Sequence, residues 1–265
     1  MSDIRAKKAL GQNFLTDMNT VAMIAEAADI RPEDNVLEIG PGLGVLTHVL
    51  AERAGHVTAI ELDERLFHKL NRDLHYKNLE IILGDALKFP YEKLEGKVKV
   101  VANLPYYIST PLITRLLAAR DNVSMMVLML QKEVAERLTA PPGGKEYGYM
   151  TVMVRLYAEA RMLFTVSKEA FDPVPKVDSA VIRLDVRDLP AAPCRDYALF
   201  EKVVSAAFSQ RRKTLRNTLK GSGLFTPEGI AAFEESGIDP GRRAETLSVT
   251  EFAQLTDFLA GFRSK

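Results

Sequence analysis

The sequence lacks several features that mark other classes of protein. Its 265 residues include one cysteine, Cys194, which excludes an internal disulfide and fits a reducing compartment, so a cytoplasmic location is expected. No apolar run approaches the length that spans a bilayer, and residues 1–10 lack the apolar core of a signal peptide. Basic and acidic residues number 35 each, so the overall charge gives no indication of a nucleic-acid partner.

Patterns for hydrolase and metal chemistry are missing as well. The chain has no G-x-S-x-G segment and no cysteine cluster. Its four histidines are scattered without the spacing of metal ligands, so we expect no metal site and a structural role for each of them: His48, His56, His68 and His75.

What the chain does have is an alternation of short apolar segments with amphipathic ones. Nearly continuous aliphatic runs predict strands over Asn35–Gly40, His56–Leu62, Leu79–Asp85, Val98–Leu104 and Ser124–Gln131. Between them, apolar residues spaced three and four apart predict helices over Val45–Arg53, Glu64–Tyr76 and Thr110–Arg120. This alternation predicts an α/β fold whose mostly parallel sheet is covered on both faces, with ligands bound beyond the carboxyl ends of the strands.

Segments on either side complete the predicted first domain. A helix capped by Thr16 or Asp17 is expected to run to about Ala28. Two strands, Ala158–Val166 and Ser179–Val186, are expected to form an antiparallel pair at the end of the sheet, which gives seven strands in all.

A break in the pattern at Asp188–Pro193 predicts a linker. We therefore expect a catalytic domain of residues 1–187 and a small helical domain of residues 194–265. The helices predicted in the second domain are Tyr197–Ser209, Lys213–Leu219, Pro227–Glu235 and Glu251–Phe262, the last after a Ser248-x-x-Glu251 capping box.

A glycine-rich loop follows the first of the predicted strands and opens a helix. Gly40, Gly42 and Gly44 lack Cβ atoms, so the loop can turn tightly and a ligand can lie against its backbone. Glu61 and Asp85 end the next two strands, where one carboxylate can accept both ribose hydroxyls and the other can reach an adenine amino group. This arrangement predicts a nucleoside-containing cofactor.

A nicotinamide dinucleotide is the main alternative for this site. Its G-x-G-x-x-G fingerprint is not matched, because here the third glycine comes two residues after the second. Pro41 also gives the loop a different course from one that presents a helix N-terminus to a pyrophosphate. The pattern favours S-adenosylmethionine.

The segment Asn103-Leu104-Pro105-Tyr106 ends a later strand of the same sheet. An aromatic amino group is a poor nucleophile because its lone pair is delocalised. The Asn103 side-chain oxygen and the carbonyl of Leu104 or Pro105 can accept its hydrogens and direct the lone pair at a methyl group, while Pro105 stiffens the turn and Tyr106 offers a flat face to the base. With the glycine-rich loop, this segment predicts an amino methyltransferase acting on adenine or cytosine.

Two further features concern the substrate. A base locked in a helix cannot reach such a site, so the target must be flipped out or already unpaired, which requires a second stacking wall. Phe171 in the Pro-rich segment is the candidate, although a lone phenylalanine more often belongs to a core. Between Lys202 and Lys220 the chain carries no acidic residue, and this run, with a basic N-terminus, favours a surface facing phosphate over a merely solvated helix face: Arg5, Lys7, Lys8, Arg211, Arg212, Lys213 and Arg216.

At these segments the sequence resembles the small-subunit ribosomal RNA adenine dimethyltransferases, whose relatives include the macrolide-resistance methylases. The resemblance runs from about residue 5 to the C-terminus. It is carried by Leu10–Leu15, Glu38–Gly44, Asn103–Tyr106, Phe171–Ser179 and Phe208–Asn217.

The resemblance implies a Rossmann-like S-adenosylmethionine-dependent fold and several roles that spacing alone does not indicate. Asn13 and Leu15 would contact the cofactor, Phe171 would be the second stacking wall, and the enzyme would act as a monomer. The substrate would be two adjacent adenines in a hairpin loop near the 3′ end of small-subunit RNA, each dimethylated at N6 in a partly assembled subunit. A large-subunit resistance methylase, a DNA adenine methyltransferase and an inactive assembly factor of the same fold are the alternatives.

Overall fold

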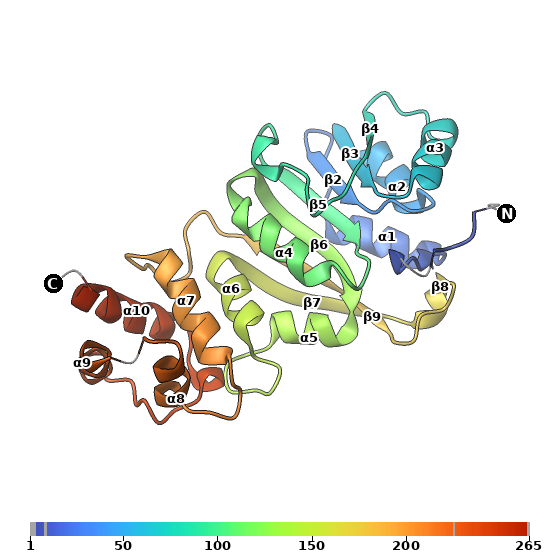
Figure 1. Ribbon diagram of the computed structural model, residues 1–265. Helices are drawn as coiled ribbons and strands as arrows, with labels where there is room; N and C mark the ends of the chain where they lie inside the picture. Colours follow the sequence, from blue (N-terminus) through green and yellow to red (C-terminus); the bar gives the residue numbers. More distant parts are fainter. Residues whose placement is uncertain (1–3, 8–9, 225, 264–265) are drawn as a thin grey trace. The chain divides into compact units, whose positions relative to one another are not determined.

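The computed structural model describes residues 4–7, 10–224 and 226–263, and it forms two compact units (Figure 1). The first unit comprises the chain up to Ala135 together with Glu159–Asp188, and the second comprises Glu136–Ala158 and the chain from Leu189 onward. The predicted division at residues 187–194 thus coincides with one crossing between the units. It does not anticipate that residues 136–158 group with the C-terminal helices.

A seven-stranded sheet forms the centre of the first unit, in the order β4-β3-β2-β5-β6-β9-β7. The five strands from β4 to β6 are parallel, and β9 runs antiparallel to β6. This confirms the predicted fold class. The strands are β2 Asn35–Ile39, β3 His56–Glu61, β4 Leu79–Leu83, β5 Val98–Asn103, β6 Val123–Gln131, β7 Ala158–Val166 and β9 Ser179–Val186.

Helices of the first unit pack on this sheet through side chains that alternate along each strand. Val36 on β2, Val101 on β5 and Val127 on β6 belong to one core cluster with α1 and α2. The intervening residues point to the opposite face, where α4 contacts β6 (Figure 1). The elements are α1 Met18–Ala27, α2 Val45–Arg53, α3 Glu64–Asp73, α4 Ser109–Ala118 and the short 3₁₀ turns η2 Tyr91–Lys93, η3 Arg120–Asn122 and η4 Lys168–Ala170.

Capping side chains confirm two predicted helix starts. The Asp17 carboxylate accepts hydrogen bonds from the backbone of Asn19 and Thr20, which makes it the N-cap of α1. In the second unit, Ser248 and Glu251 accept reciprocally from each other's backbone N–H groups and close the predicted capping box.

The second unit is helical, as predicted, but two of its helices were not expected. α5 and α6 follow β6 directly, and α5 crosses the division between the units. α8 begins at Leu215 rather than Lys213, so the basic residues before it lie in a turn. The elements are α5 Lys132–Thr139, α6 Tyr149–Tyr157, α7 Tyr197–Phe208, α8 Leu215–Gly221, α9 Pro227–Ser236, η5 Ala244–Thr246 and α10 Val249–Arg263.

A small antiparallel sheet, also not predicted, joins two distant segments of the first unit. β1 (Phe14–Leu15) pairs with β8 (Phe171–Asp172), so that Leu15 lies opposite Phe171. The pairing is extended by Thr16, whose backbone N–H donates to the Ala170 carbonyl at 2.8 Å. The N-terminal segment is therefore held against the Pro-rich segment by backbone hydrogen bonds.

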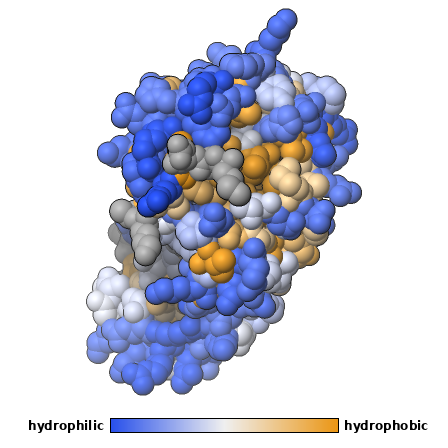
Figure 2. Space-filling model, turned by 90° about the vertical axis from the view of Figure 1, so that its right-hand side faces the viewer, coloured by the Kyte–Doolittle hydropathy of each residue, from blue (hydrophilic) through white to orange (hydrophobic). Residues whose placement is uncertain are grey.

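Figure 2 views the side that carries the N-terminal segment and shows apolar side chains gathered within a largely hydrophilic face. Large apolar side chains exposed in the first unit include Tyr107, Val174 and Val177. Within the described residues, no helix combines the length and apolar character that crossing a membrane requires.

Candidate active site

A cavity opens at the carboxyl ends of the parallel strands in the first unit. It is enclosed by the N-terminal segment, the β2–α2 loop, the ends of β3 and β4, the turn after β5, and Phe171. Its lining contains every residue predicted for cofactor or base: Asn13, Leu15, Gly40, Gly42, Glu61, Asp85, Asn103, Leu104, Pro105, Tyr106 and Phe171.

The glycine-rich loop adopts a backbone that other residues rarely accept. Gly40, Gly42 and Gly44 have φ values of 70°, 59° and 86°. A Cβ atom on Gly40 would lie 3.8 Å from Pro105 Cδ, and one on Gly42 would lie 3.3 Å from Phe14. The loop therefore lies beside the turn after β5 on one side and the N-terminal segment on the other.

Glu61 is the last residue of β3, and its carboxylate is fixed by two backbone groups. Oε2 accepts from Gly42 N at 3.2 Å and Oε1 accepts from Asp63 N at 2.8 Å. Burial raises the pKa of Glu61, against the effect of these hydrogen bonds. Because a carboxylate offers about four acceptor positions, two remain for hydroxyl donors of a ligand.

Glu38, a cavity residue that the sequence analysis did not single out, lies on β2. It is fully buried, and within the described residues its Oε2 atom has no hydrogen-bond partner. Burial raises the pKa of Glu38 to about 8, with Glu61 repulsion adding to the shift and the Thr47 hydroxyl opposing it. The sequence signal was a single acid inside the apolar run Val36-Leu37-Glu38-Ile39.

Asp85 and Asn13 also line the cavity. Asp85 follows β4, and its Oδ1 accepts from Leu87 N at 2.9 Å, which orients the carboxylate. Asn13 precedes β1, and its side-chain amide donates to the Gly11 carbonyl at 3.3 Å. Both side chains are partly exposed and in reach of a ligand in the cavity.

The turn after β5 is held by hydrogen bonds that leave Asn103 half-buried at the cavity. Leu104 N donates to the Met129 carbonyl of β6 at 3.1 Å, and the Pro105 carbonyl accepts from Ile108 N at 3.1 Å. The Pro105 carbonyl is thus already used by the turn. Of the two carbonyls that the sequence left open as a second acceptor, the geometry favours that of Leu104.

Tyr106 is held through both its side chain and its backbone. Its hydroxyl lies 2.9 Å from Ser179 Oγ, a buried group on β9, and its carbonyl accepts from Ser109 Oγ at 2.9 Å. Burial raises the pKa of Tyr106, and the Ser179 hydroxyl opposes that shift. The ring is a preorganised flat surface at the cavity.

Phe171 lines the cavity from β8 and is only 2% exposed. It belongs at the same time to the core cluster that contains Leu15. Both roles considered for it, core residue and wall of a base pocket, are compatible with this position.

The basic residues proposed for RNA lie in the second unit. Arg211, Arg212 and Lys213 occupy the turn between α7 and α8, and Arg216 lies on α8, all with exposed side chains. In the described part of the chain, the side chains of Arg211, Arg212 and Lys213 form no ion pair. Of the basic N-terminus, Arg5 and Lys7 are described, and Lys8 lies outside the described residues.

Among the described residues, no group of three or more histidine, cysteine, aspartate or glutamate side chains could hold a metal ion.

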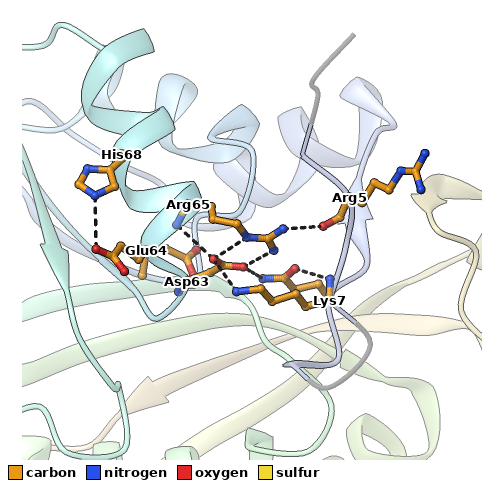
Figure 3. A network of polar contacts seen from close by, with 8 residues as sticks. Arg5, Lys7, Asp63, Glu64, Arg65 and His68 are labelled. Carbon is orange, nitrogen blue, oxygen red and sulfur yellow. Dashed lines mark hydrogen bonds and ion pairs between the residues drawn. The ribbon is translucent and has the colours of Figure 1, made fainter.

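A network of polar side chains centred on Asp63 lies beside the cavity and was not predicted from the sequence (Figure 3). Its sequence signal was a second acid two residues after Glu61, in a chain whose N-terminus is basic.

Comparison with known proteins places this geometry in a family. Residues 4–261 match the family described as ribosomal RNA adenine dimethylase. The chain is 47% identical to ribosomal RNA small subunit methyltransferase A of Pelotomaculum thermopropionicum, over 96% of this chain and 91% of that protein. It is 45% identical to the protein of the same name from Clostridium acetobutylicum, over 96% and 94%.

Solved structures agree in fold. A dimethyladenosine transferase from Plasmodium falciparum superposes with a TM-score of 0.82 and 29% identity, over 95% of this chain and 98% of that one. The 23S rRNA methyltransferase ErmE superposes with a TM-score of 0.72 and 30% identity, over 94% and 100%. With its glycine-rich loop, Glu61 and the Asn103–Tyr106 turn around one cavity, the chain belongs to the ribosomal RNA adenine dimethylase family.

Proposed function

We propose that this protein transfers methyl groups from S-adenosylmethionine to N6 of adenine in small-subunit ribosomal RNA. The targets would be two adjacent adenines in a hairpin loop near the 3′ end, each dimethylated within an assembling subunit. The observation that carries the proposal is the close approach of the glycine-rich loop to the Asn103–Tyr106 turn, because it brings a cofactor site and an amine site into one cavity. The names of the relatives support the substrate.

The chain's own residues fit this cofactor. The positive φ values of Gly40 and Gly42 leave a backbone wall against which a ligand can lie. Glu61 retains acceptor positions for two ribose hydroxyls, and Asp85 can accept from the adenine amino group. Asn13 and Leu15 would contact the cofactor from the N-terminal segment. When bound, S-adenosylmethionine supplies a sulfonium methyl group for in-line displacement.

Catalysis by the protein then consists of positioning and of fixed acceptors. The Asn103 side-chain oxygen and the Leu104 carbonyl would accept the two amino hydrogens, which directs the nitrogen lone pair at the methyl carbon. Pro105 fixes the turn before the substrate arrives, so these acceptors need little reorganisation. No strong base is required, because the proton can leave after the methyl group has transferred.

The target adenine must leave its stack to enter the cavity. Tyr106, anchored through Ser179, would take one face of the base. Phe171 would take the other face, which its place in the cavity lining allows. The two-stranded sheet holds Phe171 beside Leu15, so the two predicted ligand sites share a wall.

The second unit would bind the RNA backbone. Arg211, Arg212, Lys213 and Arg216 would face phosphate, in line with their exposure and with the lack of ion pairs for the first three within the described residues. In this scheme residues 1–187 carry catalysis and residues 194–265 contact RNA. The protein would act as a cytoplasmic monomer whose partner is the immature small subunit.

The test is transfer of labelled methyl groups to three substrates. Small subunits that lack the modification should accept up to four methyl groups each, and mature small subunits should accept few. Large subunits form the third arm, because ErmE, a structural neighbour, is named for 23S rRNA. Labelling of large subunits in preference to unmodified small ones would contradict the proposal, and labelling of none would favour an inactive assembly factor.

A further inference from the structure

Asp63 is the centre of a polar network beside the cavity (Figure 3). Its side chain has no exposed surface, although its partners Lys7 and Arg65 reach solvent. Arg65 donates from Nε at 3.1 Å and from Nη2 at 2.6 Å, Lys7 Nζ lies at 3.1 Å, and Gln12 Nε2 lies at 3.1 Å. These donors hold the pKa of Asp63 well below its usual range, so the carboxylate is ionised.

Two of these donors come from the N-terminal segment, more than fifty positions earlier in the chain. Lys7 is also bonded to later residues of this segment, because Lys7 N donates to Gln12 Oε1 at 2.7 Å and Leu10 N donates to the Lys7 carbonyl at 3.0 Å. Gln12 therefore accepts from Lys7 and donates to Asp63, which fixes its orientation. A further contact joins Arg65 Nη1 to the Arg5 carbonyl at 3.4 Å.

The residues held in this way form one side of the cavity. Gln12 and the next three residues line it, and Phe14 lies against Gly42 of the glycine-rich loop. Beyond them, β1 is tied to β8. The segment is thus fastened at two points, by backbone pairing at Phe14–Leu15 and by the Asp63 side chain at Lys7 and Gln12.

Asp63 also contacts the predicted ribose site. Its backbone N–H donates to Glu61 Oε1, and the other Glu61 oxygen accepts from Gly42. Asp63 is in addition the N-cap of α3, since Oδ1 accepts from Arg65 N. The Asp63 side chain thus holds the wall of the cavity, and its backbone N–H holds the carboxylate inside it.

We propose that Asp63 is a positioning residue that latches the N-terminal segment over the cofactor cavity and thereby slows the release of S-adenosylmethionine. The inference deepens the proposed function and rests on its cofactor. With the latch intact, the segment is a wall of a closed site. Without it, the segment is free to open about its attachment at β1, and the cofactor leaves through the opened side.

The test compares Asp63→Asn with Asp73→Asn. Asp73 is a matched control, because it also lies by α3 and pairs with two cations, Lys69 and Arg72. Neither of these cations lines the cavity, whereas Gln12, a partner of Asp63, does. Asp63→Asn should raise the Kd for S-adenosylmethionine by about tenfold or more, mainly through a faster dissociation rate, as expected for loss of charge-assisted hydrogen bonds. Asp73→Asn should leave both the Kd and the dissociation rate within about twofold of wild type.

Two milder variants keep the inference testable if Asp63→Asn does not fold. Lys7→Met and Gln12→Ala each remove one partner of Asp63. Each should speed cofactor release, but by less than Asp63→Asn does. Trypsin supplies an independent measure, since cleavage after Arg5 and Lys7 should be slowed by S-adenosylmethionine in wild type and much less in Gln12→Ala. At saturating cofactor, kcat for methyl transfer by Lys7→Met, whose side chain does not line the cavity, should stay near the wild-type value, whereas a merely structural defect would lower kcat and Tm together.

The outcomes separate this inference from the function on which it rests. A wild-type protein that does not bind S-adenosylmethionine refutes the proposed function. In the other case, the wild-type protein binds the cofactor and all three variants release it at the wild-type rate: Asp63→Asn, Lys7→Met and Gln12→Ala. That result overturns the latch and leaves the proposed function standing.

Discussion

The buried carboxyl of Glu38 makes stability depend on pH in a way that one substitution should remove. In the folded protein the pKa of Glu38 is raised to about 8, against 4.5 for an ordinary glutamate. Between these two values the folded state holds a proton that the unfolded state has lost. The contribution of Glu38 to the free energy of unfolding is therefore fully present below pH 4.5 and is lost as the pH rises toward 8.

The size of the effect follows from the shift. Each pH unit in this window changes the free energy of unfolding by about 1.4 kcal/mol per proton. From pH 5.5 to 7.5, wild-type protein should therefore lose about 2.5 kcal/mol of stability on account of Glu38. Glu38→Gln has nearly the same shape and carries no titrating group, so this part of the pH dependence should vanish.

Urea unfolding of the cofactor-free protein at the two pH values measures this difference. Circular dichroism is the suitable signal because the chain has no tryptophan. Glu61 remains in both proteins, and Glu33→Gln, at an exposed position, controls for loss of an ordinary carboxyl. If the free energy of unfolding changes equally in wild type and in Glu38→Gln between pH 5.5 and 7.5, the reasoning is refuted.

Other predictions follow from the site and its surroundings. Asn103→Ala should lower methyl transfer about a hundredfold or more with little change in S-adenosylmethionine affinity, and activity within a few-fold of wild type would remove its assigned role. Glu61→Ala should weaken cofactor binding measured by calorimetry by at least about tenfold, since hydrogen bonds to a carboxylate are lost. The double reversal Arg211→Glu and Lys213→Glu should weaken binding to small subunits, with an unchanged Tm. The slope of log K against log salt concentration should fall in magnitude by about one unit or less per lost contact. Gly44→Ala should lower Tm, because its φ is 86° and a Cβ would meet Leu70 at 2.7 Å.

Much of the fold could be predicted because its signals are local. The parallel strands β2, β3, β5 and β6 are buried along most of their length, so each appears as a nearly continuous aliphatic run. The predicted bounds of Val45–Arg53, Ala158–Val166 and Ser179–Val186 agree with α2, β7 and β9. Glycines, acids and the Asn103–Tyr106 turn all mark strand ends, and parallel strands bring their ends together. Local pattern and topology were therefore enough to assemble the cavity.

The features that escaped prediction depend on distant partners. β1 and β8 are two residues long and exist through each other's backbone groups, so neither has a periodicity to detect. Asp63 gains its network from residues 7 and 12, which no spacing rule connects with it. The grouping of residues 136–158 with the C-terminal helices likewise arises from packing between α6 and α7.

The pairing of β1 with β8 implies that the N-terminal segment tolerates exchange of residues better than changes of length. Backbone hydrogen bonds hold Phe14 opposite Asp172 and Leu15 opposite Phe171 whatever the side chains are. Successive side chains of a strand point to opposite faces, so an insertion or deletion of one residue turns each of them to the wrong side. Here it would shift Leu15 against Phe171, so a single lost codon between residues 13 and 16 would affect the proposed cofactor wall and the proposed base wall together.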